Sequence, residues 1–342
     1  MNKVKNTLFS NKPVTIDENS LIMAIESSCD ETACAIVKGG REVLANVVAS
    51  QIKIHEEFGG VIPEIAAREH LEAVNVIIDE VLKQADVKGE NITAFAGTVG
   101  PGLVGCLLVG LNAAKSLALA YDKPFIGINH LNAHLAANFI DTDLEPPFMA
   151  LLVSGGHTQI IDVKSYSEME IIGETIDDAV GEAYDKVARL IGLPYPGGPK
   201  LDKAAQEGNP HAFSLPEGKV DGYNFSFSGL KTAVLRLVKS FDGKELPVND
   251  ICASFQECVS STLLKKLKKA ADERGYKQIV LAGGVAANSE IRRKVFNLEN
   301  DGFKVFAPAM KYCTDNASMV ASAAFFFENT FDNIDVEVFS RA

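Results

Sequence analysis

Both halves of the chain carry one pattern, in which an apolar strand, a short turn of small polar residues and a second apolar strand follow one another. The first copy spans 21–37 around the polar segment 26–32, and the second spans 148–163 around the segment 154–158. Apolar runs bounded by such turns are typical of buried strands. The two copies share little sequence identity, so the repeat is architectural. It predicts two α/β domains of similar build.

The first copy continues into further regular structure. Residues 41–50 look like a third strand, which makes the copy a β-meander. Pro63 stands where a helix favours proline, at its first position. The helix that follows is expected to bury one apolar face, formed by residues at helical spacing. These residues are Leu71, Val74, Ile77, Ile78, Val81 and Leu82.

The second half offers two helix starts. Thr175–Asp178 has the form of a capping box, with an acid three residues after the threonine, although Glu or Gln is more usual there. It predicts the start of a helix that ends at Leu190. Ser226 or Ser228 is expected to cap another helix over 229–240.

Length and composition favour two domains without membrane attachment. The chain has 342 residues, of which 47% are apolar. We expect an N-terminal extension over 1–20, an N-terminal lobe over 21–147 and a C-terminal lobe over 148–342, whose final helix is a candidate to pack back on the first lobe. Residues 1–20 lack the apolar core of a signal peptide. No run approaches the roughly 20 apolar residues of a membrane span, so we expect a cytoplasmic protein.

Charge and cysteine content exclude several classes of protein. The formal net charge of −12 argues against broad, non-specific nucleic-acid binding, but it leaves room for a local basic patch or a basic partner. Lys265, Lys266, Lys268 and Lys269 form either a solvated helix face or a contact for RNA. The six cysteines form no Cys-x-x-Cys pair. They are therefore expected to be free, mostly buried thiols rather than a disulfide framework or a zinc ribbon.

Two histidines stand four residues apart, at His130 and His134. On a helix this spacing puts both rings on one face, one turn apart, where they could share a divalent metal. The alternative is a pair of histidines packed in an ordinary helix. Because two ligands are too few for a tight site, the metal interpretation needs a further ligand elsewhere in the chain.

Several glycine-rich turns are suited to ligands without identifying one. The segment 95–105 fits neither a Walker A loop nor the Gly-x-Gly-x-x-Gly pattern, and close packing of a strand and a helix explains it equally well. At 283–288 a strand ends in Gly-Gly before a helix, which suits either a nucleotide or a tight turn. The Pro/Gly loop 193–200 permits close approach of a ligand. Asp185 could be a solvated acid paired with Arg189.

Taken in order, seven motifs resemble one family, that of the tRNA N6-adenosine threonylcarbamoyltransferases, called TsaD in bacteria and formerly known as O-sialoglycoprotein endopeptidases. The resemblance covers about 21–330. Each motif is weak alone, but the ordered set is very specific. The motifs are 27–32 (Ser-Ser-Cys-Asp-Glu-Thr), His130-x-x-x-His134, 152–158 (Leu-Val-Ser-Gly-Gly-His-Thr), 196–199 (Pro-Gly-Gly-Pro), 225–232 (Phe-Ser-Phe-Ser-Gly-Leu-Lys-Thr), 283–288 (Gly-Gly-Val-Ala-Ala-Asn) and 313–316 (Cys-Thr-Asp-Asn).

The resemblance implies a fold, an activity and partners. The fold is the two-lobed α/β fold of actin-like ATPases, sugar kinases and seventy-kilodalton heat-shock proteins, with a duplicated sheet-and-helix core. The activity is transfer of a threonylcarbamoyl group from threonylcarbamoyl-AMP to the N6 amine of the adenosine beside the tRNA anticodon. Besides tRNA, the implied partners are an inactive paralogue (TsaB) and a small ATPase (TsaE).

The resemblance also assigns residues to this reaction. His130, His134 and Asp315 are implied as ligands of one divalent metal, iron or zinc, which would orient the donor or polarise its carbamoyl carbonyl. Asp30 and Glu31 are our candidates for activating or orienting the acceptor amine. The residues implied to bind the adenylate are Leu152, Val153, Ser154, Gly155, Gly156, Asp185, Gly198, Asp202 and Asn288.

Three other functions are weighed against transfer. Zinc proteases also space two histidines four apart, but they need a glutamate directly after the first, where this chain has Leu131. A sugar-kinase-like phosphotransferase or an ATPase of the same fold is the main alternative, since fold alone does not choose the chemistry. Mg²⁺-dependent kinases prefer oxygen ligands, so the histidine pair favours transfer. A non-catalytic ATP-binding scaffold is the third possibility.

Overall fold

The computed structural model describes residues 3–5, 14–327 and 331–341. The chain divides into two compact units. The first contains the chain up to Glu145 together with the chain from Thr314 onward, and the second is Pro146–Cys313. Within these described ranges, no helix combines the length and the apolar character needed to cross a bilayer.

The first unit is built on a sheet with the order β5-β4-β3-β6-β7. Its strands are β3 (Leu21–Glu26), β4 (Glu31–Lys38), β5 (Glu42–Ser50), β6 (Ala94–Gly100) and β7 (Phe125–Asn129), beside a small ribbon of β1 (Lys3–Lys5) and β2 (Val14–Ile16). Its helices are α1 (Ile52–Glu56), α2 (Pro63–Ala85), α3 (Val104–Ala120), α4 (His130–Ala136) and α10 (Ala317–Phe326), with 3-10 turns at Gly89–Asn91 and Ala137–Phe139.

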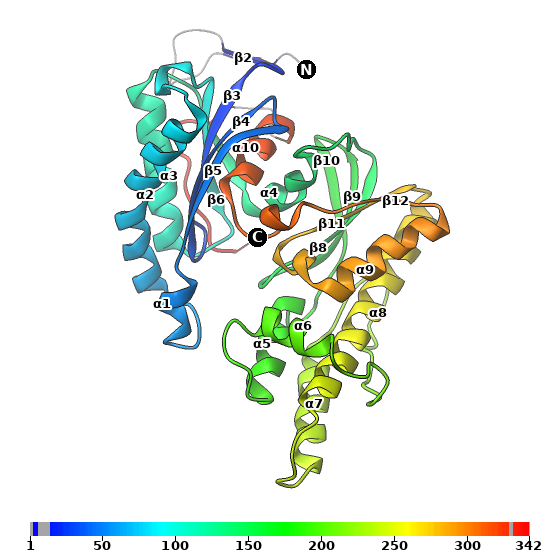
Figure 1. Ribbon diagram of the computed structural model, residues 1–342. Helices are drawn as coiled ribbons and strands as arrows, with labels where there is room; N and C mark the ends of the chain where they lie inside the picture. The colour runs from blue at the N-terminus through cyan, green and yellow to red at the C-terminus, as the bar shows by residue number, and fades with distance from the viewer. Residues whose placement is uncertain (1–2, 6–13, 328–330, 342) are drawn as a thin grey trace. The chain divides into compact units, whose positions relative to one another are not determined.

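Helices cover both faces of this sheet. Strands β3, β4 and β5 form the expected antiparallel meander, whereas β6 and β7 run parallel to β3. Parallel neighbours need crossover connections, which α2 and α3 provide on one face, while α10 packs on the other (Figure 1). Because neither face meets water, β3, β4 and β6 are almost wholly buried, and this explains their continuous apolar runs.

The second unit repeats this topology with the order β10-β9-β8-β11-β12. Its strands are β8 (Phe148–Val153), β9 (Thr158–Ser165), β10 (Glu168–Glu174), β11 (Gln278–Ala282) and β12 (Lys304–Phe306). Its helices are α5 (Val180–Leu190), α6 (Gly197–Ala205), α7 (Ser228–Ser240), α8 (Val248–Arg274) and α9 (Ser289–Asn297), with 3-10 turns at Gly284–Ala287, Leu298–Asp301 and Met310–Tyr312.

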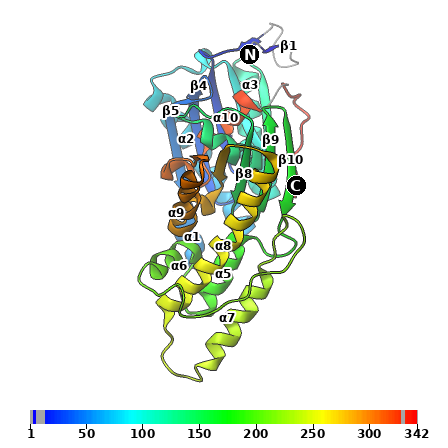
Figure 2. The same cartoon turned by 90° about the vertical axis from the view of Figure 1, so that its right-hand side faces the viewer.

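The match between the two sheets confirms the architectural repeat. In the second unit β8, β9 and β10 are antiparallel, and β11 and β12 run parallel to β8, as β6 and β7 do to β3. The long helix α8 packs against β8 (Figure 2) and contributes much of the core of this unit. All six cysteines lie in the described part of the chain and are free thiols, as expected.

The predicted burial of Leu71 on helix α2 is wrong. Val74, Ile77, Ile78 and Val81 are buried on α2 as expected, but the Leu71 side chain is 61% exposed. Its side chain therefore faces solvent rather than the core. Helical spacing alone could not reveal this, because Leu71 also fits the apolar period.

The two predicted helix caps are wrong, and one carboxylate explains why. Helix α5 begins at Val180 without a side-chain cap, and α7 begins at Ser228 without one. Asp177 instead accepts hydrogen bonds from the hydroxyls of Ser226 (2.6 Å) and Ser228 (2.7 Å) and from the Phe227 backbone N–H (2.8 Å). This carboxylate therefore ties together two segments that the sequence interpretation treated separately.

Arg41 anchors the chain that follows α4. Its guanidinium donates hydrogen bonds to the carbonyl oxygens of Phe139 (3.1 Å), Thr142 (2.7 Å) and Leu144 (2.9 Å). The same group lies 4.7 Å from the ring centroid of Phe326, at the end of α10. A planar guanidinium can serve all four contacts at once, which an ammonium cannot. Arg41 thereby fixes α4 and α10, the two elements that carry the site described below.

We expect Arg41→Ala to lower the free energy of unfolding by about 2–4 kcal/mol, because three carbonyl oxygens lose a charged donor. Urea unfolding, followed by circular dichroism, would measure it. Arg68→Ala is the control, since the Arg68–Glu64 pair is solvent-exposed on both sides and should contribute about 0.5 kcal/mol or less. Equal effects of the two substitutions would contradict the anchoring role of Arg41.

Candidate metal centre and substrate site

The histidine pair opens a short helix directly after a strand. Strand β7 ends at Asn129, whose side-chain oxygen accepts hydrogen bonds from the N–H groups of Leu131 (2.8 Å) and Asn132 (3.3 Å). This cap starts α4 at His130 and places His134 one turn further on. The two imidazole rings meet edge to face, with their centroids 4.6 Å apart.

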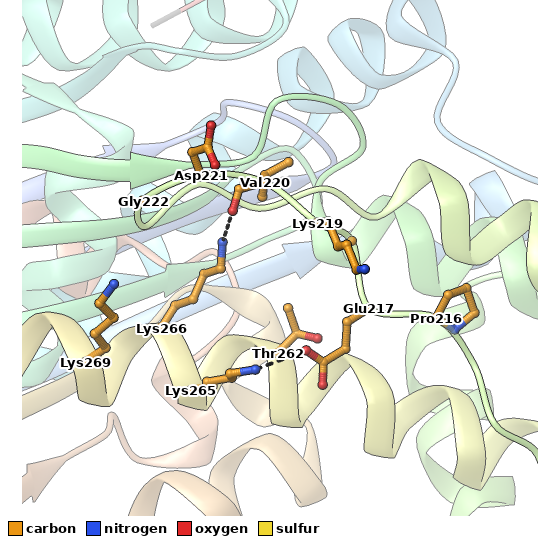
Figure 3. Close-up of a pocket in the computed structure, with 11 residues that line it drawn as sticks. Pro216, Glu217, Lys219, Val220, Asp221, Gly222, Thr262, Lys265, Lys266 and Lys269 are labelled. Atoms are coloured by element: carbon orange, nitrogen blue, oxygen red, sulfur yellow. Dashed lines mark hydrogen bonds and ion pairs between the residues drawn. The ribbon is translucent and has the colours of Figure 1, made fainter.

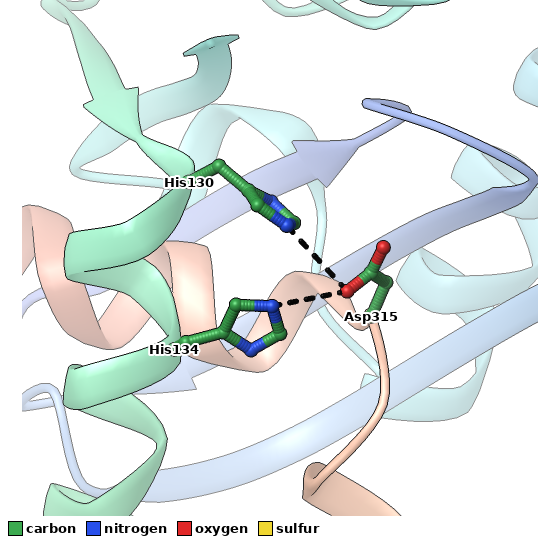
Figure 4. Close-up of side chains that lie close together, drawn as sticks. All are labelled: His130, His134 and Asp315. Carbon is green, nitrogen blue, oxygen red and sulfur yellow. Dashed lines mark ion pairs between the residues drawn. The ribbon is translucent and has the colours of Figure 1, made fainter. Parts of the chain in front are cut away.

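The third side chain arrives from the far end of the sequence. Asn316 caps α10 by accepting a hydrogen bond from the Met319 N–H, so Asp315 stands just outside that helix. Helix α10 packs on α4. As Figure 4 shows, Asp315 Oδ1 faces both rings, 3.3 Å from His134 Nε2 and 3.6 Å from His130 Nε2. The structure thus brings together the three residues expected as metal ligands.

The spacing of these atoms suits a metal ion. The three donor atoms lie within 4.8 Å of one another. Their Nε2–Oδ1 distances exceed the 2.7–2.9 Å that is usual for a charge-assisted hydrogen bond. They are close to the separation of about 3.4 Å between two ligands that each lie about 2.1 Å from a tetrahedral metal. Two imidazoles and one carboxylate could therefore hold a divalent ion and leave coordination positions for a substrate.

Opposite charges at this centre stabilise one another. Burial alone would lower the pKa of His130, but Glu26 and Asp315 outweigh it and raise that pKa to about 9. Burial likewise disfavours ionised Asp315, yet His130 and His134 lower its pKa to about 2. The centre therefore keeps a carboxylate ionised in a partly buried place, which favours a cation beside it.

Glu26 belongs to this centre and was missed by the sequence interpretation. It is the last residue of β3 and is fully buried, although its sequence position suggested a polar loop. Its Oε2 lies 3.2 Å from His130 Nδ1, and Ser28 Oγ lies 3.3 Å from the same nitrogen. An acid at the end of an otherwise apolar strand was the available signal. It was assigned to the turn because strand ends cannot be located to one residue from sequence.

Asp30 and Glu31 lie where the turn after β3 enters β4. The Asp30 carbonyl oxygen accepts a hydrogen bond from the Gln51 N–H, and Glu31 Oε1 lies 3.5 Å from the Ser50 hydroxyl. Burial, together with Asp315 and Asp30, raises the pKa of Glu31 to about 10. The negative charge of Asp315, a residue of the candidate metal centre, thus contributes to the raised pKa of Glu31.

The expected adenylate residues gather in the second unit, beginning at the carboxyl end of β8. Leu152 and Val153 are fully buried strand residues. After them the chain turns tightly, since the Ser154 N–H donates to the His157 carbonyl oxygen (2.8 Å). A Cβ atom added at Gly155 or Gly156 would meet no described atom within 4 Å beyond its chain neighbours. The turn therefore exposes backbone that a ligand could approach.

Asp185 and Gly198 are joined directly. Asp185 Oδ1 accepts hydrogen bonds from the N–H groups of Gly197 (2.8 Å) and Gly198 (3.1 Å) at the start of α6. Burial raises the pKa of Asp185, while these N–H groups and Arg189 act in the opposite direction. Asp185 thus orients the Pro/Gly loop and is more than a solvated acid.

Asp202 and Asn288 meet at the start of α9. Asp202 accepts hydrogen bonds from the Ser289 hydroxyl (2.7 Å) and the Ser289 N–H (3.2 Å). Asn288 caps α9 through the Ile291 N–H (3.0 Å) and donates to Gln256 (2.9 Å). Strand β11, which ends just before this turn, pairs with β8. The turns after both strands therefore lie at one edge of the sheet.

The lysine-rich face of α8 borders a separate cavity of about 590 Å³ in the second unit (Figure 3). Lys265 lies 3.5 Å from Glu217, and Lys266 donates to the Val220 carbonyl oxygen (3.2 Å) and to that of Asn224. Lys268 pairs with Asp272 and Asp301, and Lys269 pairs with Glu273. Because each lysine has an acidic or carbonyl partner, these contacts favour a solvated, charge-compensated face over an RNA contact.

Three solved structures share the fold. HypF from T. kodakarensis matches 94% of this chain and 51% of its own, with a TM-score of 0.64 and 14% identity. A full-length HypF in a phosphate- and nucleotide-bound form covers the same share of this chain and 50% of its own, with a TM-score of 0.61 and 16% identity. The match to component A of the (R)-2-hydroxyglutaryl-CoA dehydratase of Acidaminococcus fermentans covers 90% of this chain and 96% of that protein, with a TM-score of 0.51 and 17% identity. With the duplicated sheet, these likenesses confirm the expected fold class.

Sequence comparisons identify the family. The family model for TsaD, the tRNA N6-adenosine threonylcarbamoyltransferase, matches residues 42–322. A protein of that name from Clostridium perfringens (strain SM101) is 53% identical over 312 residues, which cover 90% of this chain and 92% of the relative. The protein of the same name from Picosynechococcus is 51% identical over 335 residues, which cover 94% of both chains. The chain therefore belongs to the family of tRNA N6-adenosine threonylcarbamoyltransferases.

Proposed function

We propose that this protein transfers the threonylcarbamoyl group of threonylcarbamoyl-AMP to the N6 amine of the adenosine adjacent to the tRNA anticodon. Membership of the family supports the reaction. The convergence of His130, His134 and Asp315 is the structural observation that carries the proposal, because it supplies a compact set of nitrogen and oxygen donors.

We assign one divalent metal, iron or zinc, to these three side chains. Both metals accept imidazole and carboxylate ligands, whereas magnesium prefers oxygen alone. When bound, the ion would supply Lewis-acid polarisation of the carbamoyl carbonyl. The protein's own contribution is to hold three donors around one point, with the caps at Asn129 and Asn316 setting where the two helices begin.

We assign the adenylate half of the donor to the second unit. The open backbone at Gly155 and Gly156 and the ordered loop at Gly198 leave room for a nucleotide against the chain. Asp202 and Asn288 present polar groups at the start of α9. Leu152 and Val153, which are buried at the end of β8, would hold the turn that carries the site in place.

The bond changes balance without a covalent enzyme intermediate. The N6 nitrogen of adenosine attacks the carbamoyl carbon, the bond from that carbon to the phosphate oxygen breaks, and AMP leaves with the electron pair. The attacking amine is a weak nucleophile, because its lone pair is delocalised into the ring, and it must lose a proton. Positioning and a nearby proton acceptor would both help. We propose Asp30 and Glu31 for orienting or activating this amine; Glu31, whose pKa is raised to about 10, would orient it as a protonated acid.

The partners follow from the same proposal. The acceptor is tRNA, and we propose that a TsaB-like inactive paralogue and a TsaE-like small ATPase assist the reaction in the cytoplasm. A net charge of −12 suits an enzyme that shares RNA binding with other subunits. The lysines of α8 agree with RNA binding being shared among subunits, because acidic side chains neutralise much of their positive charge.

A phosphotransferase or ATPase of the same fold is the second candidate. The likeness to HypF and to the dehydratase component shows a shared fold, and fold alone does not select the chemistry. Two imidazoles in the centre favour the transferase, because Mg²⁺-dependent phosphotransferases rely on oxygen ligands.

The deciding assay supplies threonylcarbamoyl-AMP, labelled in its threonyl part, and unmodified tRNA with the target adenosine. We expect label in the tRNA, with AMP released in equal amount, when the partner proteins are present. Absence of labelled tRNA even with those partners would refute the proposal. Steady ATP turnover by the isolated protein, without tRNA or partners, would favour the ATPase instead.

His134→Ala and Asp315→Ala should each lose the metal and the transfer activity, because the two remaining donors are too few for a tight site. Elemental analysis of protein purified without chelators would measure the metal and identify it. His211→Ala is the control, since His211 is an exposed histidine of the second unit. Stoichiometric metal in either of the first two variants would rule out the ligand assignment.

Asp30→Asn and Glu31→Gln test the assigned role of these acids. If either acid orients or deprotonates the amine, the corresponding variant should lose about 10²- to 10⁴-fold in kcat, the usual contribution of a general acid or base. Single-turnover transfer to tRNA at saturating donor would measure the rate. Full activity in both variants would remove Asp30 and Glu31 from the mechanism.

A further inference from the structure

A buried carboxylate lies next to the candidate metal centre, in contact with one of the three proposed ligands but not itself a member of that set. Glu26 is fully buried at the end of β3, and a charge in such a place is costly unless every oxygen is satisfied. Its Oε1 accepts the Ser28 backbone N–H at 2.6 Å. Its Oε2 accepts the Thr98 hydroxyl at 2.6 Å and also lies 3.2 Å from His130 Nδ1. The carboxylate is therefore held from both sides in one orientation.

This arrangement determines which nitrogen of a neutral His130 carries the proton. An ionised carboxylate can only accept, so the nitrogen that faces it must be Nδ1–H. The Ser28 hydroxyl, 3.3 Å from Nδ1, could act as donor or acceptor and would not decide the tautomer alone. With the proton on Nδ1, the lone pair of Nε2 is free on the side that faces Asp315 Oδ1, 3.6 Å away.

The second histidine is held in a different way. His134 Nδ1 is buried and has no hydrogen-bond partner among the described residues. Its side chain is only 2% exposed, so packing rather than a polar partner surrounds the Nδ1 side of the ring, while Nε2 faces Asp315. Of the two imidazoles, His130 is thus the one whose Nδ1 faces a carboxylate outside the proposed ligand set.

We propose that Glu26 is a positioning residue, which fixes His130 in the Nδ1–H form and aims its Nε2 at the point shared with His134 and Asp315. This inference rests on the proposed metal site and extends it to a residue outside the ligand set. Carboxylates that orient a metal-bound histidine commonly raise metal affinity, because the ligand needs no reorganisation on binding.

Glu26→Gln is the sharpest test, because the amide fits the space and reverses one hydrogen bond. If its oxygen stays on the Ser28 N–H, the NH₂ group faces His130 and must donate to Nδ1, which moves the imidazole proton to Nε2, where the metal would bind. If the amide flips, the NH₂ group confronts the Ser28 N–H, and two donors oppose each other. The first orientation disfavours the metal-binding tautomer, and the second keeps it only by setting two donors against each other in a buried place.

Zinc affinity of the metal-free full-length protein, measured by chelator competition, provides the readout. We expect Glu26→Gln to bind Zn²⁺ about 10- to 100-fold more weakly than the wild type. Asp162→Asn is the matched control, since it also replaces a carboxylate that is 1% exposed, but in the second unit. It should bind Zn²⁺ as the wild type does. Equal affinity of Glu26→Gln and the wild type would overturn the inference while leaving the metal site intact.

A second measurement needs no variant and so remains decisive if Glu26→Gln does not fold. In zinc-loaded wild-type protein with ¹⁵N-labelled histidine, the His130 ring should show a proton on Nδ1 and metal-bound Nε2. A proton on Nε2, with the metal on Nδ1, would overturn the inference. If the wild type binds no Zn²⁺, Fe²⁺ or other divalent ion, the metal assignment under the proposed function fails, and the positioning role falls with it.

Discussion

Parallel pairing of neighbouring strands governs both candidate sites. In the first unit β3 and β7 flank β6 and share its direction, so their carboxyl ends reach one edge of the sheet. That edge carries Glu26 at the end of β3 and His130 directly after β7. In the second unit the same pairing of β8 with β11 aligns the turns that follow them. Ligand sites at the carboxyl ends of parallel strands are a general property of open α/β sheets.

The chemistry of the first site depends on how acids and imidazoles share a buried space. Glu26 and Asp315 approach His130 from opposite nitrogens, at 3.2 and 3.6 Å. One carboxylate is satisfied by neighbouring hydrogen bonds, and the other faces two rings at distances suited to a shared ion. These different surroundings explain why Glu26 can orient His130 as a metal ligand, while Asp315 can itself serve as a metal ligand.

Much of the fold could be predicted from sequence, because buried strands leave continuous apolar runs and both meanders have them. The histidine pair was also visible, since helical spacing determines which side chains share a face. Leu71 could not be placed, because an apolar residue at helical spacing can still face solvent. The partners of Asp177 could not be foreseen either, because its hydrogen bonds reach residues 226–228 across a long stretch of chain. The partners of Glu26 were hidden for the same reason, since Thr98 and His130 become its neighbours only through strand pairing.

The route of the chain between the two units has a consequence for biosynthesis. Strands β3 to β7 leave the ribosome before the second unit, but α10 and Asp315 come from the segment after Thr314, which belongs to the same unit as those strands. All of Pro146–Cys313 must be translated in between. Domains commonly fold as they emerge, so the second unit can be complete while the first still lacks the cover of one sheet face. A nascent chain would thus acquire the third proposed metal donor only after the whole second unit has been made.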